Sequence, residues 1–265
     1  MWHLKPKNLG GFFGALLLLG NSFAQAEELL ITAPQVFSAE QKALEQEHSR
    51  LHFRLAEEAG IKTRLVFRPP HLARASHERG EAAAMLAATC GAERSRPNLY
   101  SIPYTQISRH LISAGESPLF TGINQLSGFT LGLINRFYYK IPSAEGLEEL
   151  EITIHGSSGY QNNFKMLARG RVDVILAPAT IMESLNANSR APLALKYAKE
   201  PFSVRALCYA VSDSDKGKLL INKLNKAIRS LHASGELASF MSSPFEVPSI
   251  EQIRLKSGKM TGSGA

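Results

Sequence analysis

Cysteine, tryptophan and long apolar runs are all scarce in this sequence. Only two of the 265 residues are cysteine and one is tryptophan. Outside the first 26 residues, no apolar stretch approaches the roughly 20 residues that a membrane-spanning helix needs. The cysteines show no C-x-x-C spacing and no neighbouring histidine cluster, so neither a zinc site nor a redox site is expected. No other pattern in the chain requires a cofactor.

An excess of one charge sign is also small. The formal net charge is +7, and two of these charges, Lys5 and Lys7, lie in the first 26 residues, which leaves +5 for the remainder. There is no basic run and no basic patch interleaved with aromatic residues, so nucleic acid is excluded as a partner. The sequence also lacks internal repeats and Gly/Ser linkers. Only the tail, residues 257–265, has the composition of a disordered segment.

The first 26 residues are organised like a secretion signal. Lys5 and Lys7 precede a short apolar core, Phe12 to Leu19, and the small residues of Ala24-Gln25-Ala26 follow. We expect cleavage after Ala26 and export of the remaining chain. The alternative is an uncleaved anchor, although the apolar core is short for a membrane span.

Export bears on the two cysteines, Cys90 and Cys208. In an oxidising compartment a pair of cysteines can form a disulfide. The sequence alone leaves two alternatives open, a long-range disulfide and two buried thiols.

Strands and helices are expected to alternate along the chain. The first half predicts strands over 29–33, 61–67 and 82–88 and helices over 38–60 and 71–78, with Ser38 and Gln41 placed like a capping box and Gly60 ending the first helix. Short connections between these elements favour a parallel α/β sheet. The second half predicts strands over 108–114, 151–154 and 206–212, a helix over 162–168 and a later helix that carries Leu220, Leu224, Ile228 and Leu231.

The segment from Thr89 to Tyr104 reads T-C-G-A-E-R-S-R-P-N-L-Y-S-I-P-Y. It resembles the segment T-x-T-x-E-R…F-S-x-P-Y of type II periplasmic solute-binding proteins (solute-binding family 3, the amino-acid-binding group). Further segments resemble the landmarks of that family in the same order: Q-L-S-G-F-T-L-G-L at 125–133, R-G-R-V-D-V-I-L at 169–176 and S-G-E-L at 234–237.

This resemblance implies an α/β, two-lobed fold with discontinuous lobes joined by a two-strand hinge. Residues 27–112 and 203–256 would form lobe one and residues 113–202 lobe two, with crossings near Ser113 and Phe202. A hinge of this kind lets two lobes close over a small ligand. The resemblance also implies a periplasmic monomer that binds a small molecule and passes it to an ABC-type permease or signals to a sensor receptor.

The resemblance also indicates the ligand-binding residues. In the family, the Arg of the E-R pair grips a ligand carboxylate, a role that falls here on Arg94, with Thr89 donating from the same loop. The family's G-T-T triplet falls on Arg136, Phe137 and Tyr138. A cation and two aromatic residues favour an anionic or aromatic ligand. The alternative is that this loop points away and that its aromatic residues pack on the lobe surface.

Another position departs from the family. Five residues after Asp173, where amino-acid binders carry an Asp that pairs with the ligand ammonium, this chain has Pro178. Proline carries no charge, so we expect that ordinary α-amino acids are not bound in the usual way. These departures also leave open an interaction or scaffold protein that has lost its small-molecule site.

Catalytic patterns are absent. His48 and His52 have a spacing that can bind metal, but without an intervening H-E-x-x-H glutamate and on a highly charged helix they are expected on a solvated face. The run Gly156-Ser157-Ser158-Gly159 is one residue too short for a G-x-S-x-G nucleophile elbow. We therefore expect a binding protein and not an enzyme.

Overall fold

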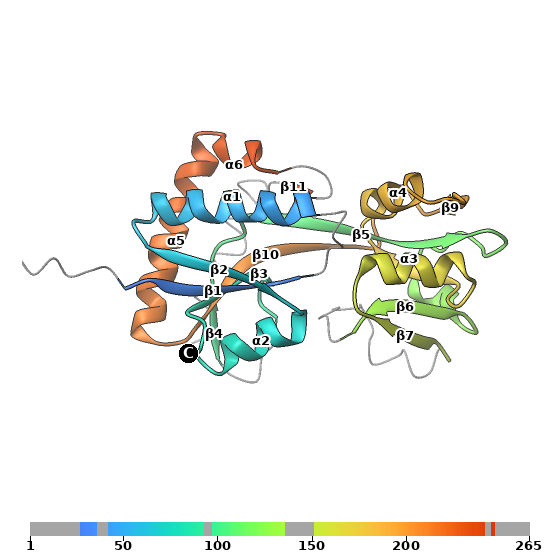
Figure 1. Cartoon of the computed structure of the whole chain (residues 1–265), viewed down its shortest axis with the longest axis horizontal. Helices are drawn as coiled ribbons and strands as arrows, with labels where there is room; N and C mark the ends of the chain where they lie inside the picture. Colours follow the sequence, from blue (N-terminus) through green and yellow to red (C-terminus); the bar gives the residue numbers. More distant parts are fainter. Residues whose placement is uncertain (1–26, 36–41, 93–96, 136–150, 242–244, 247–265) are drawn as a thin grey trace, which may run out of the picture.

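The computed structural model describes residues 27–35, 42–92, 97–135, 151–241 and 245–246 (Figure 1). The strands are β1 (Leu29–Pro34), β2 (Thr63–Arg68), β3 (Ala84–Thr89), β4 (Asn98–Tyr100), β5 (Thr105–Ala114), β6 (Thr130–Ile134), β7 (Thr153–Ser157), β8 (Val174–Ala177), β9 (Leu195–Lys196), β10 (Ser203–Ser212) and β11 (Phe245–Glu246). The helices are α1 (Lys42–Glu58), α2 (Pro70–Glu78), the 3-10 helix η2 (Ile123–Leu126), α3 (Tyr160–Ala168), α4 (Ala179–Ala187), α5 (Asp215–Ala233) and α6 (Glu236–Ser239).

The described strands are ordered β2-β1-β3-β10-β5-β8-β6-β7, with β4 paired to β10 and both β9 and β11 paired to β5. In lobe one, β1 is parallel to β2 and to β3, as the sequence predicted. Gly60, with φ 61°, ends α1 in a left-handed conformation that suits glycine. The chain can therefore turn at once into β2.

Lobe one is covered by helices on both faces of its sheet. Side chains of α1 and α5 share the main core with β1, β3 and β10. Helix α2 packs against β1, β2 and β3 from the side opposite α1 (Figure 1). Burial on both faces explains why these strands are apolar runs without strict alternation.

Strands β5 and β10 run between the two halves of the molecule (Figure 1). The first half of β5, Thr105 to Arg109, pairs with β10 in lobe one. From His110 to Ser113 the same strand pairs with β8 in lobe two. One strand thus belongs to both sheets, which gives the two-strand connection expected of the fold. The lobe boundaries drawn from the sequence, 27–112, 113–202 and 203–256, stay predictions.

Lobe two has its own parallel sheet, in which β6 is parallel to β7 and to β8. Helices α3 and α4 share a core with one face of this sheet. The other face packs against η2 and its neighbour Phe120. Strand β7 begins and ends later than the predicted 151–154, because the strand pairs with β6 through Ser157.

The two histidines of α1 contradict the sequence prediction. His48 is 4% exposed and His52 is fully buried, whereas a solvated face was expected. The two ring nitrogens of His52 lie 2.9 Å from the hydroxyl of Tyr209 and 3.0 Å from the hydroxyl of Thr63. Burial lowers the pKa of each of the two histidines to about 4, so both are neutral imidazoles at neutral pH.

Several predicted segments lie outside the described residues. These are the secretion signal (1–26), the expected capping residues Ser38 and Gln41, and the tail (257–265). Among the residues that the structure does describe, no helix combines the length and the apolar character needed to cross a membrane.

Candidate functional site

The carboxyl ends of the parallel strands in the two lobes point toward each other. Strand β8 is antiparallel to β5, and its last residue, Ala177, pairs with His110 at the lobe-one side of that pairing. Strands β6 and β7 run parallel to β8 and end on the same side. In lobe one, β10 is antiparallel to both β3 and β5, so β3 and its parallel neighbours run toward lobe two (Figure 1).

Open α/β sheets bind their ligands at the carboxyl ends of their strands. The facing strand ends therefore define the candidate site. The strands that contribute end at Pro34, Arg68 and Thr89 in lobe one and at Ile134, Ser157 and Ala177 in lobe two.

Thr89, a predicted ligand residue, lies at this edge as the half-buried last residue of β3. It pairs with Leu207 of β10. The next residue, Cys90, donates its backbone N–H to the carbonyl of Ala206 at 3.0 Å. Cys90 is also joined to Cys208 by a disulfide, with the two Cα atoms 5.2 Å apart. Of the two alternatives for the cysteines, the structure has the disulfide, and this bond holds the Thr89 segment to the strand that crosses between the lobes.

A bulge in β3 sets the direction of the Thr89 segment. Ala87 has φ 55°, a left-handed value that alanine rarely adopts. Its backbone N–H donates to the hydroxyl of the fully buried Tyr104 at 3.0 Å. The pairing of β3 with β10 shifts register at this point, between Cys208 and Ala210. Tyr104 belongs to the motif that carried the resemblance, but no local pattern predicted this positioning role.

The predicted anion ligand Arg94 and the residues Arg136, Phe137 and Tyr138 lie outside the described residues. The described ends of the segment that contains Arg94 are anchored. The buried carbonyl group of Ala92 accepts a short hydrogen bond from the Tyr100 hydroxyl. On the other side, the Pro97 carbonyl accepts the backbone N–H of Asp213 at 3.3 Å.

Pro178 is buried at the carboxyl end of β8, immediately before α4. Its carbonyl accepts the backbone N–H of Met182 at 3.3 Å, so the residue caps the start of that helix. Residue 178 therefore provides no carboxylate to a potential ligand.

Two basic residues near the carboxyl end of β8 were not identified as candidate site residues from the sequence. Arg109 is only 1% exposed, at the point where β5 changes partners. His110, the next residue, lies with its Nδ1 3.0 Å from the carbonyl of Ala198, so Nδ1 carries the proton and donates it. Its ring contacts Tyr197 edge-on, at 5.4 Å between ring centres. No local pattern marked either residue, because their surroundings come from a distant part of the chain.

Comparison with known proteins gives structural matches only. No protein-family model matches the sequence, and no curated protein matches it either. The substrate-binding protein of an amino-acid ABC transporter matches with a TM-score of 0.62 at 16% identity, over 81% of this chain and 97% of that one.

Two further solved structures match similarly. A histidine kinase sensor domain with similarity to periplasmic binding proteins matches with a TM-score of 0.66 at 14% identity, over 82% and 95% of the two chains. A putative L-cystine ABC transporter protein from Listeria monocytogenes gives 0.64 at 15%, over 81% and 94%. The two-lobed fold of type II periplasmic binding proteins, expected from the sequence motifs, is thus confirmed.

Proposed function

We propose that this chain is an exported, periplasmic solute-binding protein that captures a small ligand between its two lobes and is not an enzyme. The observation that carries the proposal is the opposition of two sets of strand ends across a two-strand connection. Lobes joined in this way can close over a ligand by a hinge motion. The fold of the solved binding proteins and the secretion signal predicted for residues 1–26 support the same function.

The proposed ligand is anionic, aromatic or both. Arg94 would clamp a carboxylate from lobe one, with Thr89 donating beside it, and Arg136, Phe137 and Tyr138 would close from lobe two. The uncharged, buried Pro178 supports exclusion of a free ammonium group from this part of the site. Ordinary α-amino acids would therefore be poor ligands.

The proposed partner is a membrane permease or a sensor receptor. Solved proteins of this fold include both a transporter component and a kinase sensor domain, so the fold does not choose between them. The protein would act as a monomer without a cofactor.

The second candidate is an interaction protein on the same fold that has lost its small-molecule site. Pro178 is the observation that favours it, because the residue places an apolar ring where a binding protein would offer charge.

Both candidates are tested by mass spectrometry of small molecules retained by the protein purified from periplasm. The ligand identified is then titrated by calorimetry into the Arg94→Ala variant, for which we expect a loss of about 2–5 kcal/mol of binding free energy. The matched control is Arg64→Ala, which removes an exposed guanidinium from β2. Equal affinity in the Arg94 variant and the wild type would refute the clamp, and a protein that retains no small molecule would favour the interaction protein.

A further inference from the structure

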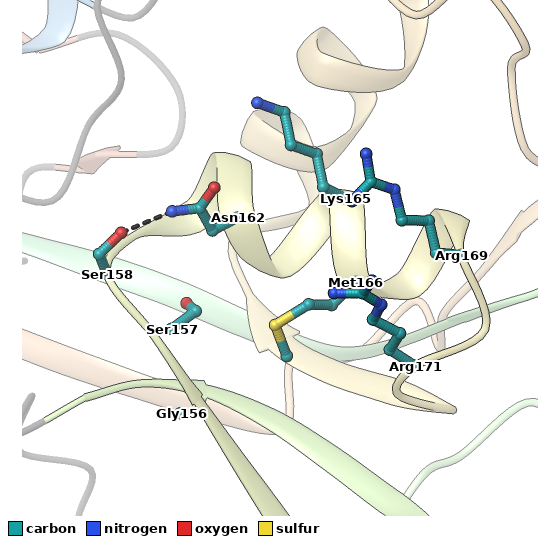
Figure 2. Close-up of a pocket in the computed structure, with 8 residues that line it drawn as sticks. All are labelled: Gly156, Ser157, Ser158, Asn162, Lys165, Met166, Arg169 and Arg171. Carbon is teal, nitrogen blue, oxygen red and sulfur yellow. Dashed lines mark hydrogen bonds between the residues drawn. The ribbon is translucent and has the colours of Figure 1, made fainter.

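A cavity of about 270 Å³ lies on lobe two, along α3 and beside the carboxyl end of β7. Figure 2 shows Ser158 and Asn162 at one end of it and Lys165, Arg169 and Arg171 toward the other. The volume is slightly below that of most drug-sized ligand sites, so it suits a small molecule.

The cavity-lining residues of α3 and its C-cap Arg169 lie on one stripe of the helix. Asn162, Lys165, Met166 and Arg169 recur at intervals of three and four residues, and side chains at these intervals share a helix face. Phe164 and Leu167 lie on the opposite face and pack into the core of lobe two. Burial of the apolar face therefore fixes the cationic stripe toward the cavity.

Gly170 lets the chain turn back after α3, and this turn places a third cation, Arg171, beside the stripe. With φ 61°, it follows α3 in the left-handed conformation. Its N–H donates to the Leu167 carbonyl at 3.1 Å, and the N–H of Arg171 donates to the Met166 carbonyl at 2.9 Å. This pair of bonds is the Schellman motif, and it brings the backbone of Arg171 against the last turn of the helix.

The cavity has no counter-charge of its own. No acidic residue lines it, and in the described part of the chain none of Lys165, Arg169 and Arg171 forms an ion pair. Lys165 and Arg169 are four residues apart, a spacing at which like charges destabilise a helix. Three cations around one small cavity thus repel each other until an anion is bound.

The polar end of the cavity can add hydrogen-bond donors. The Asn162 amide donates to the Ser158 hydroxyl oxygen at 2.5 Å, which leaves the Ser158 O–H and a second amide hydrogen of Asn162 for a ligand. Guanidinium and ammonium groups together with neutral donors are the groups that bind phosphate and carboxylate oxygens.

We propose that this cavity is a second ligand site, for a small oxyanion with two or more negative charges, such as a phosphate ester or a polycarboxylate. Its cationic end lies away from the proposed interlobe ligand, whereas Ser157 at its polar end is also one of the strand ends of the interlobe site. Helix α3 follows β7, so its amino end faces lobe one, whereas Arg169 and Arg171 lie beyond its carboxyl end. Nine helical residues separate the two ends by about 13 Å.

Calorimetric titration of the full chain with inorganic pyrophosphate, and separately with citrate, tests the site. We expect the variant Lys165→Gln/Arg169→Gln/Arg171→Gln to bind pyrophosphate at least about tenfold more weakly than the wild type, as loss of three partly solvated charge pairs implies. The matched control is Lys223→Gln/Lys226→Gln/Arg229→Gln. It removes the same charge from an exposed face of α5 and should bind like the wild type.

Each further outcome decides the proposal. Retention of pyrophosphate binding in Arg94→Ala supports a site separate from the interlobe ligand, whereas its loss there overturns the separation. An equal loss in the α5 control overturns the site in favour of non-specific attraction to net charge. If the wild type binds neither pyrophosphate nor citrate, the proposed site is refuted. It is also refuted if the wild type binds only vesicles that contain phosphatidylglycerol, since the cations would then contact a membrane surface.

Discussion

Removal of the Cys90–Cys208 disulfide should destabilise the protein strongly. The bond closes a loop with a sequence separation of 118 residues, which includes all of lobe two. In the chain-entropy model, a cross-link over a loop of this length destabilises the unfolded chain by about 5 kcal/mol. That is a large part of the total stability of a typical protein, about 5–15 kcal/mol. We therefore expect the free energy of unfolding of Cys90→Ala/Cys208→Ala to fall by several kcal/mol.

The measurement is urea denaturation followed by far-UV circular dichroism, because the only tryptophan, Trp2, lies within the predicted secretion signal. The wild type in reducing buffer is the control, since it loses the bond without losing the two sulfur atoms from the interior. The free energies of unfolding of the reduced wild type and of the double variant should differ only by the cost of truncating the buried Cys208 side chain to alanine. A loss below about 1 kcal/mol in both would refute the loop-closure reasoning.

Three further perturbations test the fold around the candidate sites. His48 and His52 have pKa values lowered to about 4, so below pH 6.5 the unfolded chain binds protons that the folded chain excludes. The free energy of unfolding should therefore decrease as the pH is lowered, by about 2 kcal/mol per histidine between pH 7.5 and pH 5 in urea titrations. The decrease should be smaller in His48→Gln, which keeps only one of the two histidines. Tyr104→Phe leaves the N–H of the half-buried Ala87 without its acceptor and should reduce stability by about 1–3 kcal/mol, with faster hydrogen exchange at Ala87 as the specific readout. Gly170→Ala meets open space but keeps φ near 61°, so a loss of about 1 kcal/mol should come from backbone strain alone, with a smaller loss for Gly170→Asn.

Local patterns were sufficient to predict most strands and helices. The apolar run at 29–33 is followed by Pro34, and the helix after it ends at Gly60, so both boundaries depend on residues that restrict or permit particular backbone angles. The parallel order of β1, β2 and β3 followed from short connections through helices. These features require no knowledge of distant contacts.

The errors and omissions arose where a distant residue determines the local structure. The charged surroundings of His52 indicated solvent, yet its partner Tyr209 lies 157 residues away in the sequence. Alanine gives no sequence signal of a left-handed backbone, and the bulge at Ala87 depends on the Tyr104 hydroxyl. Arg109 resembles any other arginine on a strand until the chain returns as β10 beside it.

Strand β10 accounts for most of this long-range determination. Adjacent side chains on a strand point to opposite faces of the sheet. Cys208 is bonded to Cys90 beside the Thr89 segment, and its neighbour Tyr209 reaches His52 of α1 on the other face. The same strand pairs with β5, which continues into lobe two. The position of Thr89 at the candidate site thus depends on a segment more than 110 residues later in the chain, and replacements in β10 should alter ligand binding without any contact to the ligand.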